Sequence, residues 1–314
     1  MPSIAFASVM AIGIVSVAAR AGGVGLLSTL LAVVAALVYV ALICWALAGR
    51  DSLRGHMREP GAALGLLTFV AASDVLASRA GARWLEVALG SVALAGWLVI
   101  GGFALRAPRV REEIRGSWLL ASVAPHSLAI VAARLAVPYT ASWLLALAWV
   151  WWLVGVLMYV LVAAPLARHA RRRPIELAGD HWIVMGALAI GALAAGGLVR
   201  ASSQLGWASG FEDVARAAEV VLWIGASAAI PLLLIAEARA WPPSLGIERW
   251  STVFPLGMYA TATYALRVRT GVGWLETVAT VFLWIAVAAL ATVAAASTRG
   301  LRRSLRPRSR SRQA

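Results

Sequence analysis

The chain has 314 residues, of which 61% are apolar and only 13% are charged. Soluble proteins carry about twice that share of charged residues, so the composition excludes a soluble enzyme or binding domain. The formal net charge is +14, but the basic residues collect in short segments between apolar stretches. That placement argues against nucleic acid as a partner.

Ten apolar stretches follow one another along the chain, and each is long enough in helix to cross a hydrocarbon core of about 30 Å. They are residues 2–19, 26–48, 61–78, 87–105, 116–133, 141–167, 182–199, 220–236, 251–266 and 277–298. The first stretch lacks a basic n-region and a convincing cleavage site, so we expect it to be retained. We predict one all-α, ten-helix transmembrane domain over residues 1–298, followed by a basic disordered tail over 299–314.

The odd-numbered and even-numbered spans differ in composition. Odd spans hold the small and polar residues, whereas most even spans are longer and rich in Ala, Leu, Val and Trp. Small residues let helices approach closely, and bulky apolar residues face lipid. We predict five helical hairpins around a quasi-five-fold axis, with odd helices inside and even helices outside. The inner helices could leave a central path or pack into a closed bundle, and the composition favours neither.

The basic residues also predict the orientation. All 28 are arginines, and 20 of them lie in the tail and in the segments that follow even spans. By the positive-inside rule that side is cytoplasmic, so we expect a multi-pass protein of the plasma membrane with both termini in the cytoplasm. The absence of lysine excludes a retinal Schiff base. The arginine-rich tail is typical of a segment that binds anionic lipid headgroups.

Each odd span ends in an arginine at nearly the same offset, which the orientation places at the extracytoplasmic end. They are Arg20, Arg79, Arg134, Arg200 and Arg267. Arginines at a pore mouth would concentrate anions by focusing the electric field. The alternative is that they only anchor helix C-termini at the interface.

Two other polar residues lie within odd spans. His126 follows Pro125 and is either bonded to backbone or a pore-facing proton or anion contact. Asp74 lies five residues before Arg79, and it is either a member of an ion pair or a carboxylate that couples protons to transport. No span carries two histidines, and no histidine–carboxylate group has metal-ligand spacing, so we expect no cofactor and no metal site. We also find no nucleophile–base spacing typical of an enzyme.

Four segments together resemble the tellurite-resistance/dicarboxylate transporter family, which includes bacterial tellurite-resistance proteins, plant slow-type anion channels and fungal malate and sulfite transporters. They are Phe6–Ser16 (FASVMAIGIVS), Ser117–Val131 (SWLLASVAPHSLAIV), Asp180–Ile190 (DHWIVMGALAI) and Trp250–Leu266 (WSTVFPLGMYATATYAL). The last is the most specific, and the resemblance covers essentially the whole chain.

The resemblance implies five hairpins whose odd helices line a pore, and a homotrimer with one pore per subunit. It also implies that a phenylalanine on the ninth helix closes the pore, and aligned on Trp250 that residue is Phe254. The adjacent Pro255 weakens the helix locally and could let the aromatic ring move.

Two functions therefore remain open. The first is a channel or transporter for small inorganic or organic anions, such as C4-dicarboxylates (malate), gated by Phe254. The second is a proton-coupled secondary exporter of dicarboxylate, sulfite or tellurite-related anions, with Asp74 or His126 as the coupling group. An intramembrane enzyme is the least supported class.

Overall fold

The computed structural model describes residues 5–49, 60–106, 115–172, 180–239 and 249–304, and within these ranges every regular element is a helix. Most of the predicted basic segments fall between these ranges, among them Arg54 and Arg109, and so lie outside the described residues. Residues 305–314 of the predicted lipid-binding tail do so as well.

Five inner helical passes form the centre of the molecule. They are α1 (Ala7–Ala21), α4 with α5 (Pro60–Leu66 and Thr68–Arg79), η1 with α7 (Gly116–Leu119 and Leu120–Ala136), η2 with α9 (Asp180–Trp182 and Ile183–Gln204), and α11 (Trp250–Thr270). Helix α1 contacts α5, α5 contacts α7, α7 contacts α9, α9 contacts α11, and α11 returns to α1. The inner helices therefore close into a ring of five.

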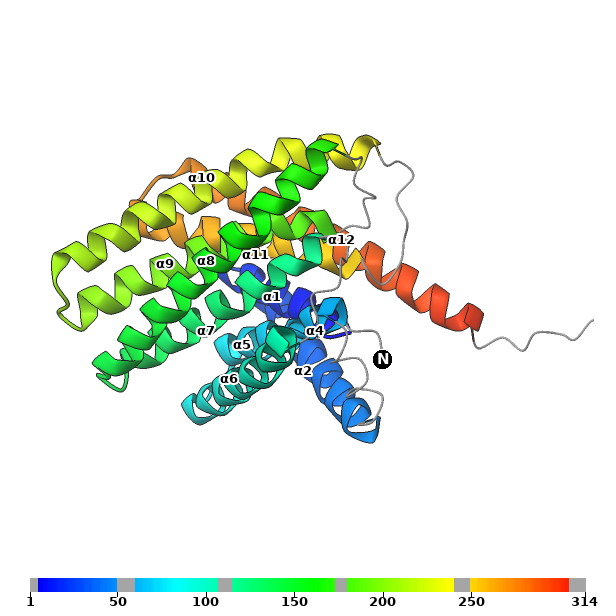
Figure 1. Ribbon diagram of the computed structural model, residues 1–314, viewed down its shortest axis with the longest axis horizontal. Coiled ribbons are helices and arrows are strands. Elements are labelled where there is room, and N and C mark those ends of the chain that lie inside the picture. The colour runs from blue at the N-terminus through cyan, green and yellow to red at the C-terminus, as the bar shows by residue number, and fades with distance from the viewer. Residues whose placement is uncertain (1–4, 50–59, 107–114, 173–179, 240–248, 305–314) are drawn as a thin grey trace, which may run out of the picture.

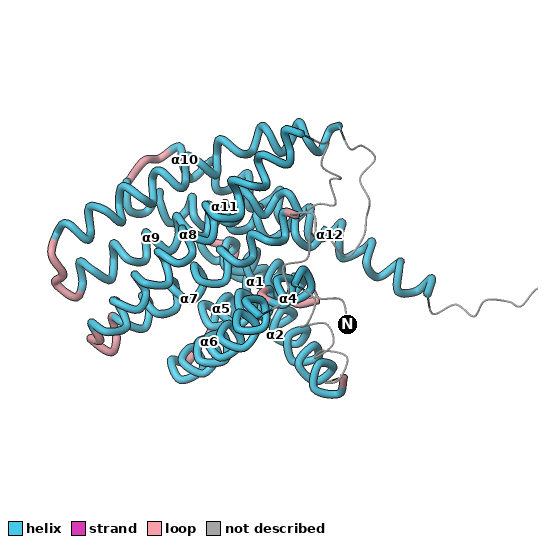
Figure 2. The backbone as a smooth tube through the Cα atoms, viewed as in Figure 1, coloured by secondary structure: helices cyan, strands magenta, loops and turns pink. Residues whose placement is uncertain are grey.

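Five outer helices surround this ring. They are α2 (Gly25–Ala48), α6 (Arg83–Arg106), α8 (Ser142–Arg172), α10 (Ser209–Arg239) and α12 (Trp274–Ser304). Each packs against the inner helix that precedes it in the chain and also touches the inner helix of the next hairpin. In Figure 1, α2, α6 and α10 lie at the periphery, with α1 near the middle of the view. In Figure 2, short turns join α7 to α8 and α9 to α10 at the same end of the bundle.

Burial separates the two kinds of helix as the composition predicts. The inner passes that end at Arg79, Ala136 and Gln204 are 72–83% buried over their apolar window, whereas the outer helices are only 11–28% buried. The outer surface of Leu, Val and Trp side chains has no protein to cover it and suits a lipid environment. The predicted arrangement of five hairpins, odd helices inside, is confirmed.

Hydrogen bonds from outer aromatic residues connect consecutive hairpins. Tyr39 of α2 bonds Ser73 of α5 (2.7 Å), and Trp152 of α8 donates to the Gly191 carbonyl of α9 (3.1 Å). Trp223 of α10 donates to Thr263 of α11 (2.9 Å). An amphipathic aromatic residue can do this because its ring stays in the apolar layer while its polar atom reaches an inner helix.

The helix lengths differ in part from the predicted spans. Helices α8, α10 and α12 have 31 residues each, about 46 Å at 1.5 Å per residue, so they extend beyond a hydrocarbon core of about 30 Å. Helix α12 continues to Ser304, six residues into the segment that we predicted to be disordered. Arginine is a good helix former and is stabilised at a helix C-terminus, which explains the extension.

Within the described residues, eight helices are long and apolar enough to cross a membrane by length and hydropathy. The shorter apolar helix Ala7–Ala21 has 15 residues, and α11 carries four threonines and two arginines that lower its hydropathy. The count of ten spans stays a prediction.

Candidate functional site: two connected cavities lined by arginines

A cavity of about 620 Å³, which we call the vestibule, opens at the end of the bundle where the inner helices reach their C-termini. Five arginines and one glutamate are among its lining residues. They are Arg20, Arg79, Arg83, Arg134, Arg200 and Glu86. Four of the five predicted mouth arginines are thus brought together from four different inner helices.

Several arginines at this end reach back to the preceding hairpin. The Nε of Arg79 donates to Ser16 of α1 (3.0 Å), and Nη1 of Arg134 donates to the Ser78 carbonyl of α5 (2.9 Å). Arg134 also pairs with Glu86 of α6 at 2.8 Å. These bonds hold the guanidinium groups in place rather than leaving them to extend into lipid headgroups. Arg200 has no acidic partner among the described residues.

A second cavity of about 180 Å³, the inner cavity, lies deeper among all five inner passes. Arg134 and Arg200 line both cavities, so they stand where the vestibule continues into the inner cavity. The deeper wall includes Ile14 of α1, Ile190 of α9 and Met258 of α11. A guanidinium group offers fixed hydrogen-bond donors and a permanent charge, so the passage between the cavities can bind an anion.

Arg267, the fifth predicted mouth arginine, lines neither cavity. Its Nη2 lies 2.7 Å from Oε2 of Glu276 on α12, and both side chains are largely exposed. Arg269 lines the inner cavity instead. Arg269 comes two residues after Arg267, which is about 200° around a helix, so the two side chains leave α11 on nearly opposite faces.

The sequence holds a signal that would have identified Arg269. The residues of α11 that line the inner cavity are Met258, Thr261, Ala265 and Arg269, spaced three to four positions apart. This is the spacing of one helix face, and Arg267 does not belong to it. The acidic partner of Arg269, Glu219 of α10, was also missed, because a glutamate near a span edge carries no signal of its own.

Phe254 is completely buried and lies four residues, one helical turn, before the cavity-lining Met258. It is not among the residues that line the inner cavity, which ends short of it. Pro255 lies inside α11 and packs against Gly186 of α9, where a Cβ would approach the proline Cγ to 2.9 Å. Phe254 therefore lies in the tightly packed layer beyond the cavity floor.

Asp74 lines the inner cavity and is only 3% exposed. Ser127 of α7 donates to its Oδ2 at 2.6 Å, whereas Oδ1 has no hydrogen-bond partner within the described part of the chain. Asp74 and Arg79 are not joined by an ion pair there; Arg79 bonds Ser16 instead. A buried carboxyl group in the wall of a cavity, with one oxygen unpartnered, is a candidate for binding a proton.

His126 lies apart from both cavities. It is 1% exposed and packs against Gly155 of α8 and Gly191 of α9, where Cβ atoms would lie 2.6 and 3.2 Å from the ring. Its Nδ1 is 3.4 Å from Ser122 Oγ. The structure places this histidine in an interhelical slot, away from the predicted pore contact.

A further polar cluster lies at the opposite end of the inner helices. Oε1 of Glu237 on α10 accepts a hydrogen bond from Arg249 (2.5 Å). Oε2 accepts one from Trp182 (3.1 Å) and lies 3.2 Å from His181 Nε2. Asp180 accepts a bond from the Ser117 amide at 3.0 Å. No group of three or more His, Cys, Asp or Glu side chains with metal-binding geometry occurs among the described residues.

Comparison with known proteins identifies relatives of the chain. Two curated relatives, both uncharacterized membrane proteins from strains of Mycobacterium tuberculosis, are 31% identical to it over 121 residues. That region is 37% of this chain and 61% of the length of each relative.

The family model for the voltage-dependent anion channel matches residues 1–298. This match confirms the resemblance seen in the sequence, and the family consists of membrane channels and transporters of anions. The chain belongs to the voltage-dependent anion channel family.

Proposed function

We propose that the chain carries small anions across the plasma membrane through the ring of inner helices, with entry at the vestibule. The observation that carries the proposal is that Arg134 and Arg200 line both the vestibule and the inner cavity. An anion can therefore move from the wide cavity to the narrow one without leaving guanidinium donors. The positive-inside rule makes the vestibule the extracytoplasmic end and both termini cytoplasmic.

We propose further that Phe254 is the gate. The inner cavity ends near Met258, and the fully buried Phe254 lies one helical turn further from the vestibule, so its ring is the next obstacle along α11. Pro255 has no N–H to donate to the Ser251 carbonyl, which weakens the helix beside the ring. An aromatic side chain in a narrow apolar constriction also excludes water, and a dewetted constriction blocks ions.

A proton-coupled carrier is the second candidate, and it is favoured by Asp74, a buried residue that lines the inner cavity and whose Oδ1 has no hydrogen-bond partner among the described residues. In this case the carboxyl group would bind and release a proton as an anion such as malate or sulfite passes. His126 fits this role less well, because it packs in an interhelical slot away from the cavities.

The assembly that we propose, following the family resemblance, is a homotrimer with one pathway in each chain. The lipid-facing surface carries large exposed side chains such as Trp84 (71%) and Leu232 (68%), which could contact either lipid or a neighbouring chain. Chemical cross-linking in native membranes should yield a trimer band, and a monomer alone would contradict the assembly.

The experiment that tests the function is flux from proteoliposomes containing the purified chain. Chloride, nitrate, sulfite, succinate and malate are compared with and without a pH gradient. We expect efflux of anions but not of potassium. Flux that is linear in concentration and independent of protons supports the channel, and saturable proton-linked flux supports the carrier. Liposomes that retain every anion would contradict both.

A further inference from the structure

We infer, building on the proposed function, that the inner cavity selects singly charged over doubly charged anions, because Glu219 cancels the charge of Arg269. Glu219 lies on the outer helix α10 and lines neither cavity, so it acts on the permeant anion only through Arg269.

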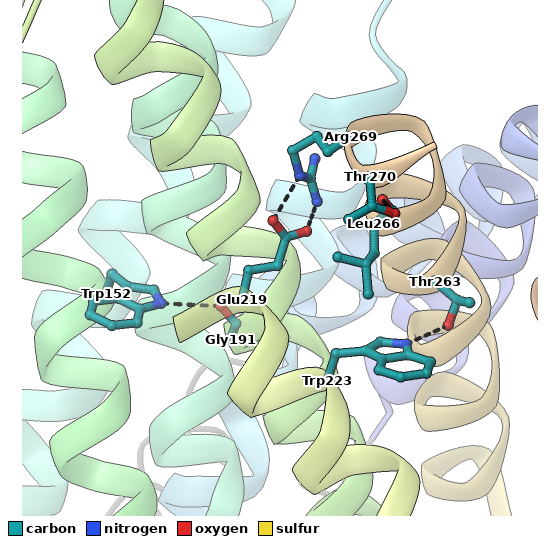
Figure 3. A network of polar contacts seen from close by, with 8 residues as sticks. All are labelled: Trp152, Gly191, Glu219, Trp223, Thr263, Leu266, Arg269 and Thr270. Atoms are coloured by element: carbon teal, nitrogen blue, oxygen red, sulfur yellow. Dashed lines mark hydrogen bonds and ion pairs between the residues drawn. The ribbon is translucent and has the colours of Figure 1, made fainter. Parts of the chain in front are cut away.

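Glu219 of α10 and Arg269 of α11 form an ion pair in which the carboxylate is buried (Figure 3). The Nε of Arg269 on α11 donates to Oε2 of Glu219 on α10 at 2.8 Å, and Nη2 contacts Oε1. The side chain of Glu219 is only 3% exposed. The pair fits because Gly196 of α9 lies beside it, where a Cβ would come within 2.1 Å of Nη2 and 2.7 Å of Oε1.

The carboxylate is held in place rather than mobile. Glu219 lies within α10, which packs along the length of α9, and the two-point contact with a guanidinium group has a fixed geometry. Arg269 therefore keeps its place at the cavity wall with two of its nitrogen atoms turned to Glu219. The carboxylate beside it cancels its net charge.

The remaining charges of the inner cavity can be counted in the same way. Three arginines line it, and Arg134 is paired with Glu86 while Arg269 is paired with Glu219. Only Arg200 lacks an acidic partner in the described part of the chain. Asp74, the other charged residue in the lining, can only lower the total. The inner cavity thus offers at most one uncompensated positive charge.

This count sets the valence of the anion that the cavity can accept. Moving an ion out of water is costly, and the cost is recovered only where opposite charge compensates it. One uncompensated arginine matches one negative charge, and a second negative charge would enter without compensation. The vestibule, with five arginines against one glutamate, attracts anions of either valence, so selection by charge falls to the inner cavity.

The test compares two solutes of nearly equal size and different charge. Succinate carries two charges at neutral pH, and succinamate, with one carboxylate replaced by an amide, carries one. Permeation of both is measured in proteoliposomes with the full-length chain. We expect the wild type to favour succinamate. Glu219→Gln leaves Arg269 uncompensated and should shift the ratio toward succinate by about tenfold, the effect of one added charge at about 10 Å in an effective dielectric constant of about 20.

The matched control is Glu212→Gln on the same helix. Glu212 pairs with Arg216 and lines neither cavity, and the Arg216 side chain is 55% exposed, so water screens the charge that Glu212→Gln frees and the ratio should stay close to the wild-type value. The double variant Glu219→Gln with Arg269→Gln removes both charges of the pair and should restore the wild-type ratio. If the ion pair were purely structural, removing both side chains would not restore the wild-type ratio.

A further variant lowers the positive charge of the inner cavity instead of raising it, and leaves Glu219 in place. Arg200→Gln removes the uncompensated charge and should shift the ratio about tenfold toward succinamate. The inference is overturned if wild type favours succinate, if Arg200→Gln leaves the ratio unchanged, or if a folded Glu219→Gln protein behaves like Glu212→Gln. Failure of the proposed function would look different, because then neither solute would permeate in any variant.

Discussion

At the residue scale, the chemistry of the pathway depends on which polar side chains face the cavities. Arg200 and Asp74 do so, and His126, which looks equally promising in the sequence, does not. The two glycines that contact the histidine ring lie on α8 and α9, more than 25 residues away, so no local pattern around Pro125 reveals the slot. Asp74 and Arg79 were predicted as a possible ion pair, yet Arg79 bonds Ser16 and Asp74 bonds Ser127.

Replacing Asp74 separates the two candidate transport modes. If its carboxyl group couples protons to anions, Asp74→Asn should abolish the dependence of anion flux on a pH gradient, because an amide cannot take up the proton. The amide keeps the shape of the side chain and can still meet Ser127. The measurement is proteoliposome flux at equal and unequal pH on the two sides. Asp74 has no coupling role if wild-type flux does not depend on the pH gradient, or if flux through Asp74→Asn still depends on it.

At the scale of elements, the sequence predicts the helices well and their mutual rotation poorly. Span composition separates inner from outer helices because burial in protein and exposure to lipid select different residues. The face that each inner helix turns to the centre depends on contacts across hairpins, such as the bond from Trp223 to Thr263. The composition of the span therefore does not distinguish Arg267 from Arg269, and only Arg269 lines the inner cavity. The predicted gate at Phe254 came from the family resemblance, since burial alone does not mark a pore residue.

Close packing around His126 gives a test of the helix arrangement. Gly155→Ala would place a Cβ 2.6 Å from the ring, so we expect it to destabilise the fold by about 1–3 kcal/mol, the usual cost of overpacking a core. Gly101→Ala is the control, because a Cβ there meets nothing within 4 Å. The measurement is the apparent melting temperature in detergent. Equal melting of both variants would contradict the described packing of α8 on α7.

At the scale of the whole molecule, repetition creates the function. Five similar hairpins bring the C-termini of their inner helices to one end, so the arginines that end four successive inner helices, 55–66 residues apart in the chain, surround one vestibule. No single hairpin contains the site. In the proposed mechanism the two cavities have different roles: the vestibule gathers anions through its electric field, and the inner cavity discriminates among them.

The field of the vestibule can be tested by removing two charges. Arg20→Gln with Arg79→Gln should lower anion flux by a factor of a few to about ten at low ionic strength, and less at about 0.1 M salt, where the Debye length is about 10 Å. Arg216→Gln with Arg267→Gln is the matched control, because both residues pair with glutamates outside the two cavities. If the two double variants show the same flux and salt dependence, the arginines only anchor the helices.

The most direct measurement of the central claim is the anion current through Phe254→Ala in a planar bilayer. The pathway is proposed to pass along the inner helices and to be closed by this ring, so removing the ring should raise the current well above that of the wild type. Phe282→Ala on the outer helix α12 should leave the current unchanged, although Phe282 also packs against α11 through Tyr259. A folded Phe254→Ala protein with wild-type or smaller current would contradict a pathway through the inner ring.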